Sequence, residues 1–400
     1  MANDSDSDDE LPPGWREQAN KDGSVAFINA CTGEATFEHP VTRKRKCVPK
    51  ELPFGWVEQF DGGKVFVNCQ TGQRTTVDPR LAFKTEDTDT FRRRFDSHAT
   101  CWDVLEGINL SNKTVLVTGG SAGIGWLTAL SLAAHGSRVV FTTRNFAQSE
   151  DAIKQALSDR PNLKLEAMFV DFLDLSSVRS FAFEFRKKYD TLNILILNAG
   201  IFGPGFELSR DGFESTLQVN HLSQFYLYKQ LQSLLVSSSP SRVIVLSSES
   251  HRQSFLTTPE DISEERLTMK SPGRFWFSLV AYNDSKLFNI LFARELDRRM
   301  SKQGIRALAV HPGNMIRTSI SRTWWFWKLL FFLASPFTKS IEQGAATTVY
   351  AAASPDMEDR GALYLNNCCI CSATKAANDD KLAEKLWRVS EKILKDLNMQ

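Results

Sequence analysis

The 400-residue sequence lacks an apolar run long enough to cross a bilayer as a helix, which takes roughly 20 residues. Its longest apolar stretch, TWWFWKLLFFLASPF, is shorter and contains Lys328. Within it, the residues from Trp324 to Leu333 fit an aromatic helix that borders a pocket or makes peripheral contact with a membrane, and equally fit ordinary core packing. The sequence thus argues against a membrane-spanning helix and leaves peripheral membrane contact open.

The sequence also lacks an excess of charge of one sign, a secretory leader and a disulfide framework. The 48 Lys and Arg against 47 Asp and Glu give a net charge of +1, so the overall charge gives no reason to expect nucleic-acid binding. The stretch DSDSDDE is acidic, and we expect residues 1–10 to be a disordered tail and not a leader. The seven cysteines are odd in number and lie at no zinc-binding spacing, which indicates an intracellular, reducing setting and no metal site.

One local departure from the balanced charge is the basic run RKRK, from Arg43 to Lys46. A run of this length fits a solvated linker, and it also fits a nuclear-localisation patch. The two interpretations are not separated by the sequence.

Two short segments near the start share a pattern. Each opens with Leu-Pro-x-Gly-Trp, continues through glycine-containing turns and β-type stretches, and closes on a proline. The pattern predicts two small three-stranded all-β domains, whose cores depend on an aromatic side chain and a proline packed on the tryptophan. The residues expected to pack in this way are Trp15, Phe27 and Pro40 in the first segment, and Trp56, Phe66 and Pro79 in the second.

From residue 110 onwards the pattern of apolar residues changes. Apolar β-branched runs such as KTVLVTG and SRVIVLSS alternate with segments whose apolar spacing is near 3.6 residues. Continuously apolar strands that alternate with helices indicate a parallel sheet covered on both faces, so we expect a doubly wound α/β domain of the Rossmann type. The predicted organisation is an acidic tail (1–10), a first small β domain (11–42), a basic linker (43–50), a second small β domain (51–84), a linker (85–109) and the α/β domain (110–400).

A glycine-rich loop follows the first strand of the α/β domain. The strand KTVLVTG runs directly into GGSAGIGW, which opens a helical pattern. In that context glycines let the backbone turn tightly and approach a pyrophosphate, whose charge the helix N-terminus favours. The loop residues expected to bind a dinucleotide are Gly119, Gly120, Ser121, Ala122, Gly123, Ile124 and Gly125.

The ends of the next strands indicate which cofactor binds. The second strand ends at Arg144 with no carboxylate, and a guanidinium suits the 2′-phosphate of NADP, where an acidic residue would suit NAD. Asp171, at the end of the third strand, could hydrogen-bond the adenine amine. The fourth strand ends in Asn198, Ala199 and Gly200, and these small residues let the backbone approach the cofactor.

The motif AYNDSK places Tyr282 and Lys286 four residues apart, on one face of a helix. Ser247 and Ser248 end the fifth strand, at the same sheet edge as the glycine-rich loop. A tyrosine pKa near ~10 is too high for a base at neutral pH, but a neighbouring ammonium and a cationic nicotinamide ring would lower it. The residues therefore predict an oxidoreductase with Tyr282 as acid/base, a serine on the substrate oxygen, and Lys286 also holding the ribose hydroxyls.

The sequence resembles the short-chain dehydrogenase/reductase family in the order of its motifs. These are the glycine-rich loop, NAG (Asn198 to Gly200), the strand-end serines, YNDSK and HPG (His311 to Gly313). The catalytic residues that this resemblance implies are Ser248, Tyr282, Lys286 and Asn220. It selects Ser248 over Ser247 as the substrate-binding serine, makes Asn220 a proton-relay residue, and places Thr318 on the nicotinamide carboxamide. The stretches VIVLSSESHR and AYNDSKLFNILFARELDRR further resemble a retinol-dehydrogenase-like branch, which implies a small lipophilic alcohol or ketone substrate, retinoid or steroid in type.

The two opening segments resemble WW domains, and the whole chain is similar to a family of oxidoreductases that carry paired WW domains. This resemblance implies a tumour-suppressor-like adaptor in apoptosis and Wnt signalling that binds proline-rich PPxY partners. It also implies a cytoplasmic protein with nuclear, mitochondrial and Golgi pools.

The WW-like segments depart from that family at the peptide groove. In the first, the positions of the groove aromatic, the histidine and the second tryptophan hold Ala26, Ala30 and Phe37, so that only Phe37 offers a ring to a polyproline ligand. The corresponding residues of the second segment are Val65, Cys69 and Thr76. We therefore expect weakened peptide binding, with any contact made by Phe37.

Two functions follow. The first is an NADP-dependent oxidoreductase. The second is a signalling adaptor whose dehydrogenase domain mainly binds a nucleotide. The complete catalytic set and the eroded grooves favour the first, although complete motifs can persist for cofactor binding alone.

Overall fold

The computed structural model describes residues 11–87, 95–202, 205–271, 277–313 and 339–399. The chain divides into two compact units, one of residues 1–92 with 106–109 and one of residues 93–105 with 110–400. Three predicted features lie outside the described residues: the acidic tail, Thr318, and the aromatic stretch from Trp324 to Leu333.

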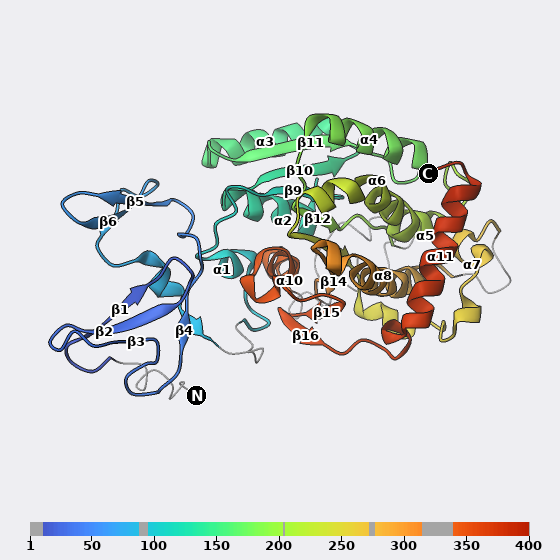
Figure 1. Cartoon of the computed structure of the whole chain (residues 1–400). Helices are drawn as coiled ribbons and strands as arrows, with labels where there is room; N and C mark the ends of the chain where they lie inside the picture. Colours follow the sequence, from blue (N-terminus) through green and yellow to red (C-terminus); the bar gives the residue numbers. More distant parts are fainter. Residues whose placement is uncertain (1–10, 88–94, 203–204, 272–276, 314–338, 400) are drawn as a thin grey trace. The chain divides into compact units, whose positions relative to one another are not determined.

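The first unit contains the two predicted small sheets, each three-stranded and antiparallel (Figure 1). The strands of the first sheet are β1 (Trp15–Ala19), β2 (Val25–Asn29) and β3 (Ala35–Thr36). Those of the second are β5 (Trp56–Phe60), β6 (Lys64–Asn68) and β7 (Arg74–Thr75). The β-branched and aromatic runs joined by glycine turns account for both sheets.

The core of the first sheet reaches beyond its predicted boundaries. Trp15 packs with buried Phe27, whose ring also meets the His39 ring edge-on at 5.2 Å between centroids. Val48 and Leu81, both outside residues 11–42, join the same cluster. A sheet this small buries little by itself, so residues from the following segments complete its core.

The basic segment 43–50 is folded. Its residues form β4 (Lys46–Cys47), which pairs antiparallel with β8 (Thr85–Glu86). Lys46 is buried in β4, whereas Lys44, which precedes the strand, is exposed and pairs with Glu86 at 2.8 Å. The predicted linker thus contains a short strand, while Arg43, Lys44 and Arg45 of the basic run are exposed.

The segment 85–109, also predicted as a linker, contains β8 and the short helix α1 (Cys101–Leu105). Cys101, Val104 and Leu105 of α1 are buried. A polar composition concealed this element, because a helix of one turn carries too few apolar residues to show a period.

A buried arginine joins the two sheets of the first unit. Arg80 lies in the 3₁₀ turn η2 (Pro79–Phe83), and its guanidinium pairs with Asp78 at 2.8 Å. It also donates to the carbonyl oxygens of Asn20 at 3.0 Å and Lys50 at 3.2 Å. The segment after the second sheet therefore bonds to the backbone of the first.

The second unit is built on an eight-stranded sheet in the order β11-β10-β9-β12-β13-β14-β15-β16, parallel except for the last pair. Its strands are β9 (Thr114–Val117), β10 (Arg138–Thr143), β11 (Lys164–Phe169), β12 (Ile194–Leu197), β13 (Ser241–Leu246), β14 (Ile305–His311), β15 (Leu363–Asn366) and β16 (Cys369–Cys371). The predicted Rossmann-type fold is confirmed, and the antiparallel edge strand β16 is an addition to it.

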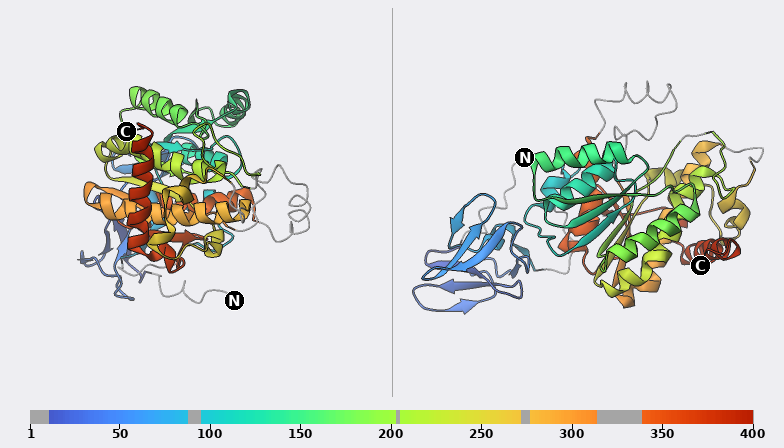
Figure 2. Two further views of the ribbon diagram at one scale, coloured as in Figure 1. Left: turned by 90° about the vertical axis from the view of Figure 1, so that its right-hand side faces the viewer. Right: turned by 90° about the horizontal axis from the view of Figure 1, so that it is seen from above.

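Helices cover both faces of this sheet (Figures 1 and 2). The longer ones are α2 (Gly123–Ala134), α3 (Phe146–Asp159), α4 (Leu175–Lys188), α6 (Ser223–Ser237), α8 (Ser278–Met300), α10 (Ile341–Ala353) and α11 (Asp380–Asp396). Shorter elements are α5 (Ser215–Leu217), the π-helical turn η3 (Gln218–Leu222), the 3₁₀ turns η4 (Glu249–Gln253) and η6 (Ser301–Gln303), and α7 (Glu264–Thr268).

The main core lies on the face that α4, α6, α8 and α11 cover. Leu195 and Leu197 of β12 belong to it, whereas Ile196 between them points to the other face. Trp387 of α11 packs edge-on against Phe225 of α6 at 5.0 Å. This packing fixes α6 and α8, which carry parts of the candidate site.

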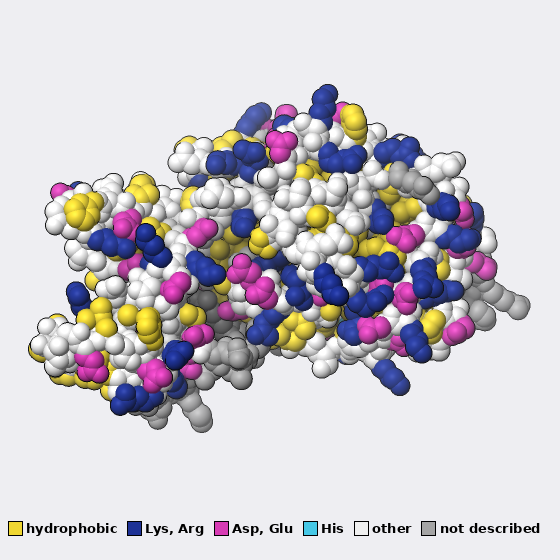
Figure 3. Space-filling view, in the orientation of Figure 1, with side chains coloured by type: hydrophobic (Ala, Val, Ile, Leu, Met, Phe, Trp, Pro, Cys, Tyr) yellow, Lys and Arg dark blue, Asp and Glu magenta, His cyan; other side chains and the backbone are white. Residues whose placement is uncertain are grey.

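Three further properties concern the part of the chain that the structure describes. None of its helices combines the length and the apolar character that a bilayer crossing requires. All seven cysteines are free thiols, and no three His, Cys, Asp or Glu side chains among these residues are grouped to hold a metal ion. On the face shown in Figure 3, basic and acidic side chains are interspersed.

Candidate active site

Thr118, directly after β9, anchors the start of the glycine-rich loop. Its hydroxyl donates to Gln224 Oε1 at 3.0 Å and accepts a hydrogen bond from Ala199 N at 2.9 Å. Gly119 N donates to Thr142 Oγ1 at 2.9 Å. The ends of β9, β10 and β12 thus hold the loop from three sides, at the carboxyl edge where ligands of such sheets bind.

The loop needs its glycines. Gly119 has a φ of +65°, and a Cβ at Gly125 would lie 2.3 Å from the Gly119 carbonyl oxygen. Helix α2 begins at Gly123, and its N-cap residue, Ala122, has no side-chain acceptor for the first-turn N–H groups. Those donors and the helix dipole make the turn suited to a phosphate. The other predicted loop residues are Gly120, Ser121 and Ile124.

Arg144 and Asp171 follow neighbouring strands at the same edge of the sheet. Arg144 comes directly after β10, is exposed, and makes no ion pair within the described part of the chain. Asp171, after β11, is half-buried and accepts a hydrogen bond from Leu173 N at 3.1 Å. An exposed guanidinium that makes no ion pair with the described residues therefore stands at the carboxyl end of β10.

The NAG segment brings backbone close to the catalytic side chains. Asn198 Nδ2 donates to the Gly119 carbonyl oxygen at 3.1 Å and so braces the glycine-rich loop. A Cβ at Gly200 would lie 3.2 Å from Asn220 Oδ1 and 3.5 Å from Lys286 Nζ. A side chain at Gly200 would crowd both groups, which explains a glycine at this position.

Tyr282 and Lys286 lie one turn apart on α8, as their spacing predicts. Lys286 Nζ is 5.3 Å from the centre of the Tyr282 ring and donates to the Leu246 carbonyl oxygen at 3.3 Å. Lys286 is buried and Tyr282 is half-buried. The Phe202 ring meets the Tyr282 ring edge-on at 4.7 Å. The two candidate catalytic groups are thus adjacent and largely withdrawn from water.

The pKa values of these two side chains are governed by burial. Burial raises the pKa of Tyr282 to about 12, and a hydrogen bond with Ser248 opposes this rise. Burial lowers the pKa of Lys286 to about 8. The ammonium of Lys286 lies over the ring of Tyr282, and burial governs the pKa of the phenol. The lowering expected from Lys286 together with a bound nicotinamide stays a prediction.

The two strand-end serines have different partners. Ser247 is buried, and its hydroxyl donates to the Lys286 carbonyl oxygen at 2.7 Å, which ties β13 to α8. Ser248 caps η4 and accepts a hydrogen bond from Ser250 N at 3.2 Å, and its hydroxyl lies near enough to Tyr282 to lower the pKa of that phenol. Of the two, Ser248 is the serine positioned beside the candidate acid/base.

Asn220 is buried in the π-helical turn η3. Its Nδ2 donates to Ser285 Oγ at 3.0 Å, and Ser285 Oγ donates to the Tyr282 carbonyl oxygen at 2.7 Å. The next residue, His221, shares a hydrogen bond of 3.1 Å with Ser390 Oγ of α11. A π turn inside a helix is an uncommon local structure that recurs at functional sites, and here it presents Asn220 to α8.

The structure therefore brings Ser248, Tyr282, Lys286 and Asn220 together at the edge that carries the glycine-rich loop. Sequence reasoning missed Thr118 and Ser285, which hold these residues in place. Thr118 precedes the first loop glycine, and Ser285 lies inside the YNDSK motif, so both belong to motifs that the sequence displays. Their partners are remote in sequence, and this is why their roles did not show.

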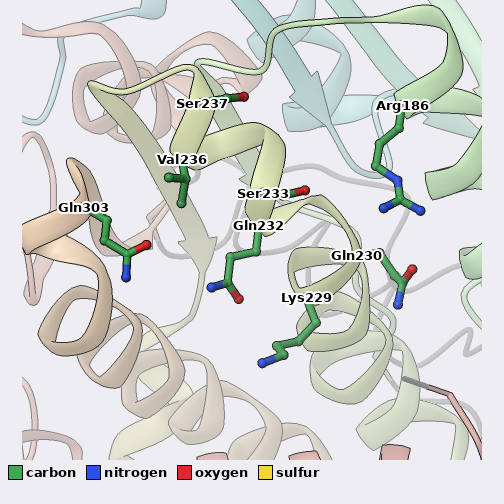
Figure 4. A pocket seen from close by; sticks show the side chains of 8 residues that line it. All are labelled: Arg186, Lys229, Gln230, Gln232, Ser233, Val236, Ser237 and Gln303. Carbon is green, nitrogen blue, oxygen red and sulfur yellow. The ribbon is translucent and has the colours of Figure 1, made fainter.

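A separate hollow lies at the opposite edge of the sheet (Figure 4). Its lining includes Arg186 of α4, Lys229 and Gln232 of α6, and Gln303 just before β14. Since α6 and η6 lead into the amino ends of β13 and β14, this hollow is remote from the candidate catalytic residues. None of the predicted site residues lines it.

The second unit is similar in sequence to a known family of enzymes. The family described as short chain dehydrogenase matches residues 113–259, which span the glycine-rich loop, NAG and the strand-end serines. Retinol dehydrogenase 12 of Mus musculus is 35% identical over 302 residues, which cover 76% of this chain and 92% of that protein. The second unit is thus a short-chain dehydrogenase in sequence as well as in fold.

Similarity over nearly the full length is more specific. WW domain-containing oxidoreductase of Gallus gallus is 44% identical over 398 residues, covering 98% of this chain and 96% of that protein. The protein of the same name from Drosophila melanogaster is 43% identical over 405 residues, covering 98% and 97%. The chain therefore belongs to the family of WW domain-containing oxidoreductases.

Solved structures agree on the fold. An uncharacterised protein from Mycobacterium paratuberculosis has a TM-score of 0.57 and 31% identity, and the match covers 74% of this chain and 98% of that one. The Pseudomonas aeruginosa RhlG/NADP active-site complex has a TM-score of 0.51 and 22% identity, with 64% and 95% covered. The second likeness bears on the fold alone.

Proposed function

We propose that this chain is an NADP-dependent oxidoreductase in which Tyr282 is the acid/base, Ser248 binds the substrate oxygen, and Lys286 and Asn220 complete the catalytic set. The observation that carries the proposal is the meeting of these side chains beside the glycine-rich loop. The Gly200 backbone lies against both Asn220 and Lys286, and the Ser248 hydroxyl lies near Tyr282.

The residues present fit a dinucleotide phosphate. Gly119 to Gly125 form a cradle that a Cβ would fill, and α2 presents first-turn N–H groups without a competing side-chain cap. Arg144 is the residue that would hold the 2′-phosphate, Asp171 the adenine amine and Lys286 the ribose hydroxyls. When bound, the cofactor would supply or accept a hydride at the substrate carbon.

The side chains can manage the accompanying proton. With a pKa near 12, Tyr282 holds its proton at neutral pH and can donate it to a carbonyl oxygen that gains negative charge. The Ser248 hydroxyl donates a hydrogen bond to the same oxygen and stabilises that charge. Asn220 holds Ser285 and, through it, the backbone of Tyr282. A protonated Tyr282 is the form that carbonyl reduction uses, whereas alcohol oxidation uses the phenolate.

The proposed substrate is a small lipophilic carbonyl compound, retinoid or steroid in type. Support comes from the similarity to retinol dehydrogenase 12 over 302 residues and from the Phe202 ring packed on Tyr282. An aromatic wall beside the reacting oxygen suits an apolar substrate, because it excludes water from the reaction.

The proposal is tested by NADPH oxidation with a panel of retinal, steroid ketones and small carbonyl compounds. We expect turnover on at least one lipophilic member, a preference for NADPH over NADH, and a loss of about 10²-fold or more in kcat for Tyr282→Phe. A Tyr189→Phe variant is the matched control, because it removes a tyrosine hydroxyl that donates to Glu166 of β11 at 2.6 Å and takes no part in the proposed site. No Tyr282-dependent turnover on any compound would overturn the proposal.

A second candidate function is supported by Phe37 on the first small sheet. Its side chain is 55% exposed, so one ring remains available to a proline-rich PPxY segment. We propose weak adaptor binding there, in a cytoplasmic protein with nuclear, mitochondrial and Golgi pools. Titration of a PPxY peptide against the full chain tests the binding, and an affinity equal to that of a Tyr→Ala peptide would refute it.

A further inference from the structure

His251 lies three residues after Ser248 and is buried within η4. Its Nδ1 is 2.7 Å from the Ser248 carbonyl oxygen, and its Nε2 accepts a hydrogen bond from Thr374 N at 3.4 Å. A backbone N–H can only donate, so Nε2 is unprotonated. The proton of the neutral ring is therefore on Nδ1, where it is donated to the Ser248 carbonyl oxygen.

Two neighbours reinforce this contact from the same turn. The Glu249 carboxylate accepts hydrogen bonds from the Tyr364 hydroxyl at 2.7 Å and from Arg252 Nε at 2.5 Å. Arg252 Nη2 donates to the Ser372 carbonyl oxygen at 2.7 Å. The His251 ring also meets the Tyr364 ring at 5.1 Å. The turn that follows Ser248 is thus held on β15 and on the segment after β16.

We propose that His251 is a positioning residue for Ser248: its Nδ1–H fixes the Ser248 carbonyl, while its Nε2 is held by Thr374 N–H, and together they aim the Ser248 hydroxyl at Tyr282. The inference rests on the proposed function, in which that hydroxyl binds the substrate oxygen. Two backbone groups of its own turn also hold Ser248: Ser250 N donates to its hydroxyl at 3.2 Å, and His251 N donates to its carbonyl oxygen at 3.1 Å. The His251 ring adds a second donor to that carbonyl, and this donor ties the turn to Thr374, so its loss would let the turn rotate and carry the hydroxyl away from Tyr282.

The arrangement requires a neutral ring. Burial lowers the pKa of His251, and nearby Arg252 adds to this effect while the Ser248 carbonyl and Glu249 oppose it. Protonation of Nε2 would set two N–H groups against each other at Thr374, so activity should fall on the acid side. The charged and titratable groups around the turn are Glu249, Arg252, Tyr364, Cys371, His311, Tyr282 and Asp284.

Two substitutions separate the two ring nitrogens. In His251→Asn the amide nitrogen can take the place of Nδ1 and still donate to the Ser248 carbonyl. In His251→Gln the amide oxygen can take the place of Nε2, and the donor to Ser248 is lost. We expect kcat to fall at least tenfold in His251→Gln and less than threefold in His251→Asn, with the Kd of NADPH unchanged within twofold in both. The acid limb of the pH profile should disappear in His251→Asn.

The matched control is His135→Gln. His135 Nδ1 contacts the Ser131 carbonyl oxygen at 2.9 Å, so the same kind of contact is lost at the far end of α2 from the glycine-rich loop. Its kcat should equal that of the wild type. Equal kcat in His251→Gln and His251→Asn, or a changed cofactor Kd in both, would contradict a positioning role.

Two measurements on the full chain do not depend on turnover. In a ¹⁵N-histidine spectrum at pH 7, the His251 signals should show a protonated Nδ1 and a bare Nε2, and the opposite tautomer would overturn the proposal. Amide hydrogen exchange across residues 247–254 should speed up in His251→Gln and not in His251→Asn. Equal exchange in the two variants would refute the role of His251, whereas a wild-type chain without turnover would contradict the proposed function alone.

Discussion

Lys286 Nζ lies 5.3 Å from the centre of the Tyr282 ring while it donates to the Leu246 carbonyl oxygen. This places an ammonium in a buried site without a carboxylate as its first partner. Asn289 Nδ2 also donates to the Leu246 oxygen, at 2.8 Å. The carbonyl therefore keeps a donor when Lys286 is replaced, and the cost of the buried ammonium can be measured by itself.

Lys286→Met should stabilise the chain at pH 7. Burial lowers the pKa of Lys286 from its ordinary value of 10.5 to about 8, so the unfolded chain binds more protons than the folded one between those pH values. The wild type therefore gains stability as pH rises through that window. Below pH 8 the buried ammonium lowers its free energy of unfolding by an amount on the order of 3 kcal/mol. Urea unfolding at several pH values should show that Lys286→Met is more stable than the wild type at pH 7 and that this difference disappears towards pH 10.5.

The control for that series is Lys154→Met, because Lys154 is exposed on α3 and its removal changes no buried charge. Its unfolding midpoint should follow the wild type at every pH. An advantage of Lys286→Met that stays constant from pH 7 to pH 10.5 would contradict the assignment of the buried charge.

Arg144→Gln should weaken NADPH binding and leave NADH binding unchanged. The exposed guanidinium pairs with no carboxylate among the described residues, so it is available to pair with the 2′-phosphate of NADPH. A tenfold rise in the Kd of NADPH, about 1.4 kcal/mol, is the expected size. Fluorescence titration measures it, with Arg186→Gln, at the opposite edge of the sheet, as the control. An equal loss for both cofactors would show that Arg144 does not read the phosphate.

Arg80→Ala should loosen the whole first unit. The guanidinium is 6% exposed, pairs with Asp78 and donates to backbone of the first sheet, so its loss leaves a buried carboxylate and several carbonyls without that donor. A destabilisation of about 3 kcal/mol or more is expected from breaking such a pair. Hydrogen exchange over residues 11–86 of the full chain should rise in both sheets.

Arg74→Ala serves as the comparison, because Arg74 pairs with Asp61 on the exposed surface and such pairs contribute roughly 0–1 kcal/mol. Its exchange should match that of the wild type. Protection lost in Arg80→Ala only within the second sheet would mean that the two sheets are independent.

Phe37→Trp should strengthen the binding of a PPxY peptide. Phe37 is the single ring left in the predicted groove, and a larger aromatic surface should add about 1 kcal/mol, or roughly fivefold in Kd. Isothermal titration of the full chain measures the change, with Phe60→Trp, on the exposed second sheet, as the control. Unchanged affinity in Phe37→Trp would indicate that the peptide binds elsewhere.

The sequence predicted the fold of the second unit well, because a parallel sheet requires continuously apolar strands and these are visible as runs. It also indicated the catalytic motifs, since Tyr282 and Lys286 are linked by helical spacing. It could not reveal η3 at Asn220, whose π turn leaves no periodic signal, or the bond from His251 to Thr374, which joins residues 123 apart in the chain.

The predicted bounds of the first small domain leave out residues that complete its sheet, for a related reason. Val48, Leu81 and Arg80 complete the first sheet from segments that look like linkers, because a single apolar or basic residue in a polar stretch carries no pattern. The raised pKa of Tyr282 was also missed, since burial depends on packing by residues such as Phe202.

Hydride transfer from NADPH to a carbonyl substrate, with Tyr282 as the proton donor, can be measured directly with a deuterium label. NADPH carrying deuterium at the transferred 4-position is incubated with the wild type or Tyr282→Phe and the lipophilic carbonyl panel, and the product alcohols are analysed by mass spectrometry. We expect deuterium at the carbinol carbon with the wild type and labelling slower by about 10²-fold or more with Tyr282→Phe. Unlabelled alcohols, or equal labelling by the two proteins, would contradict this expectation.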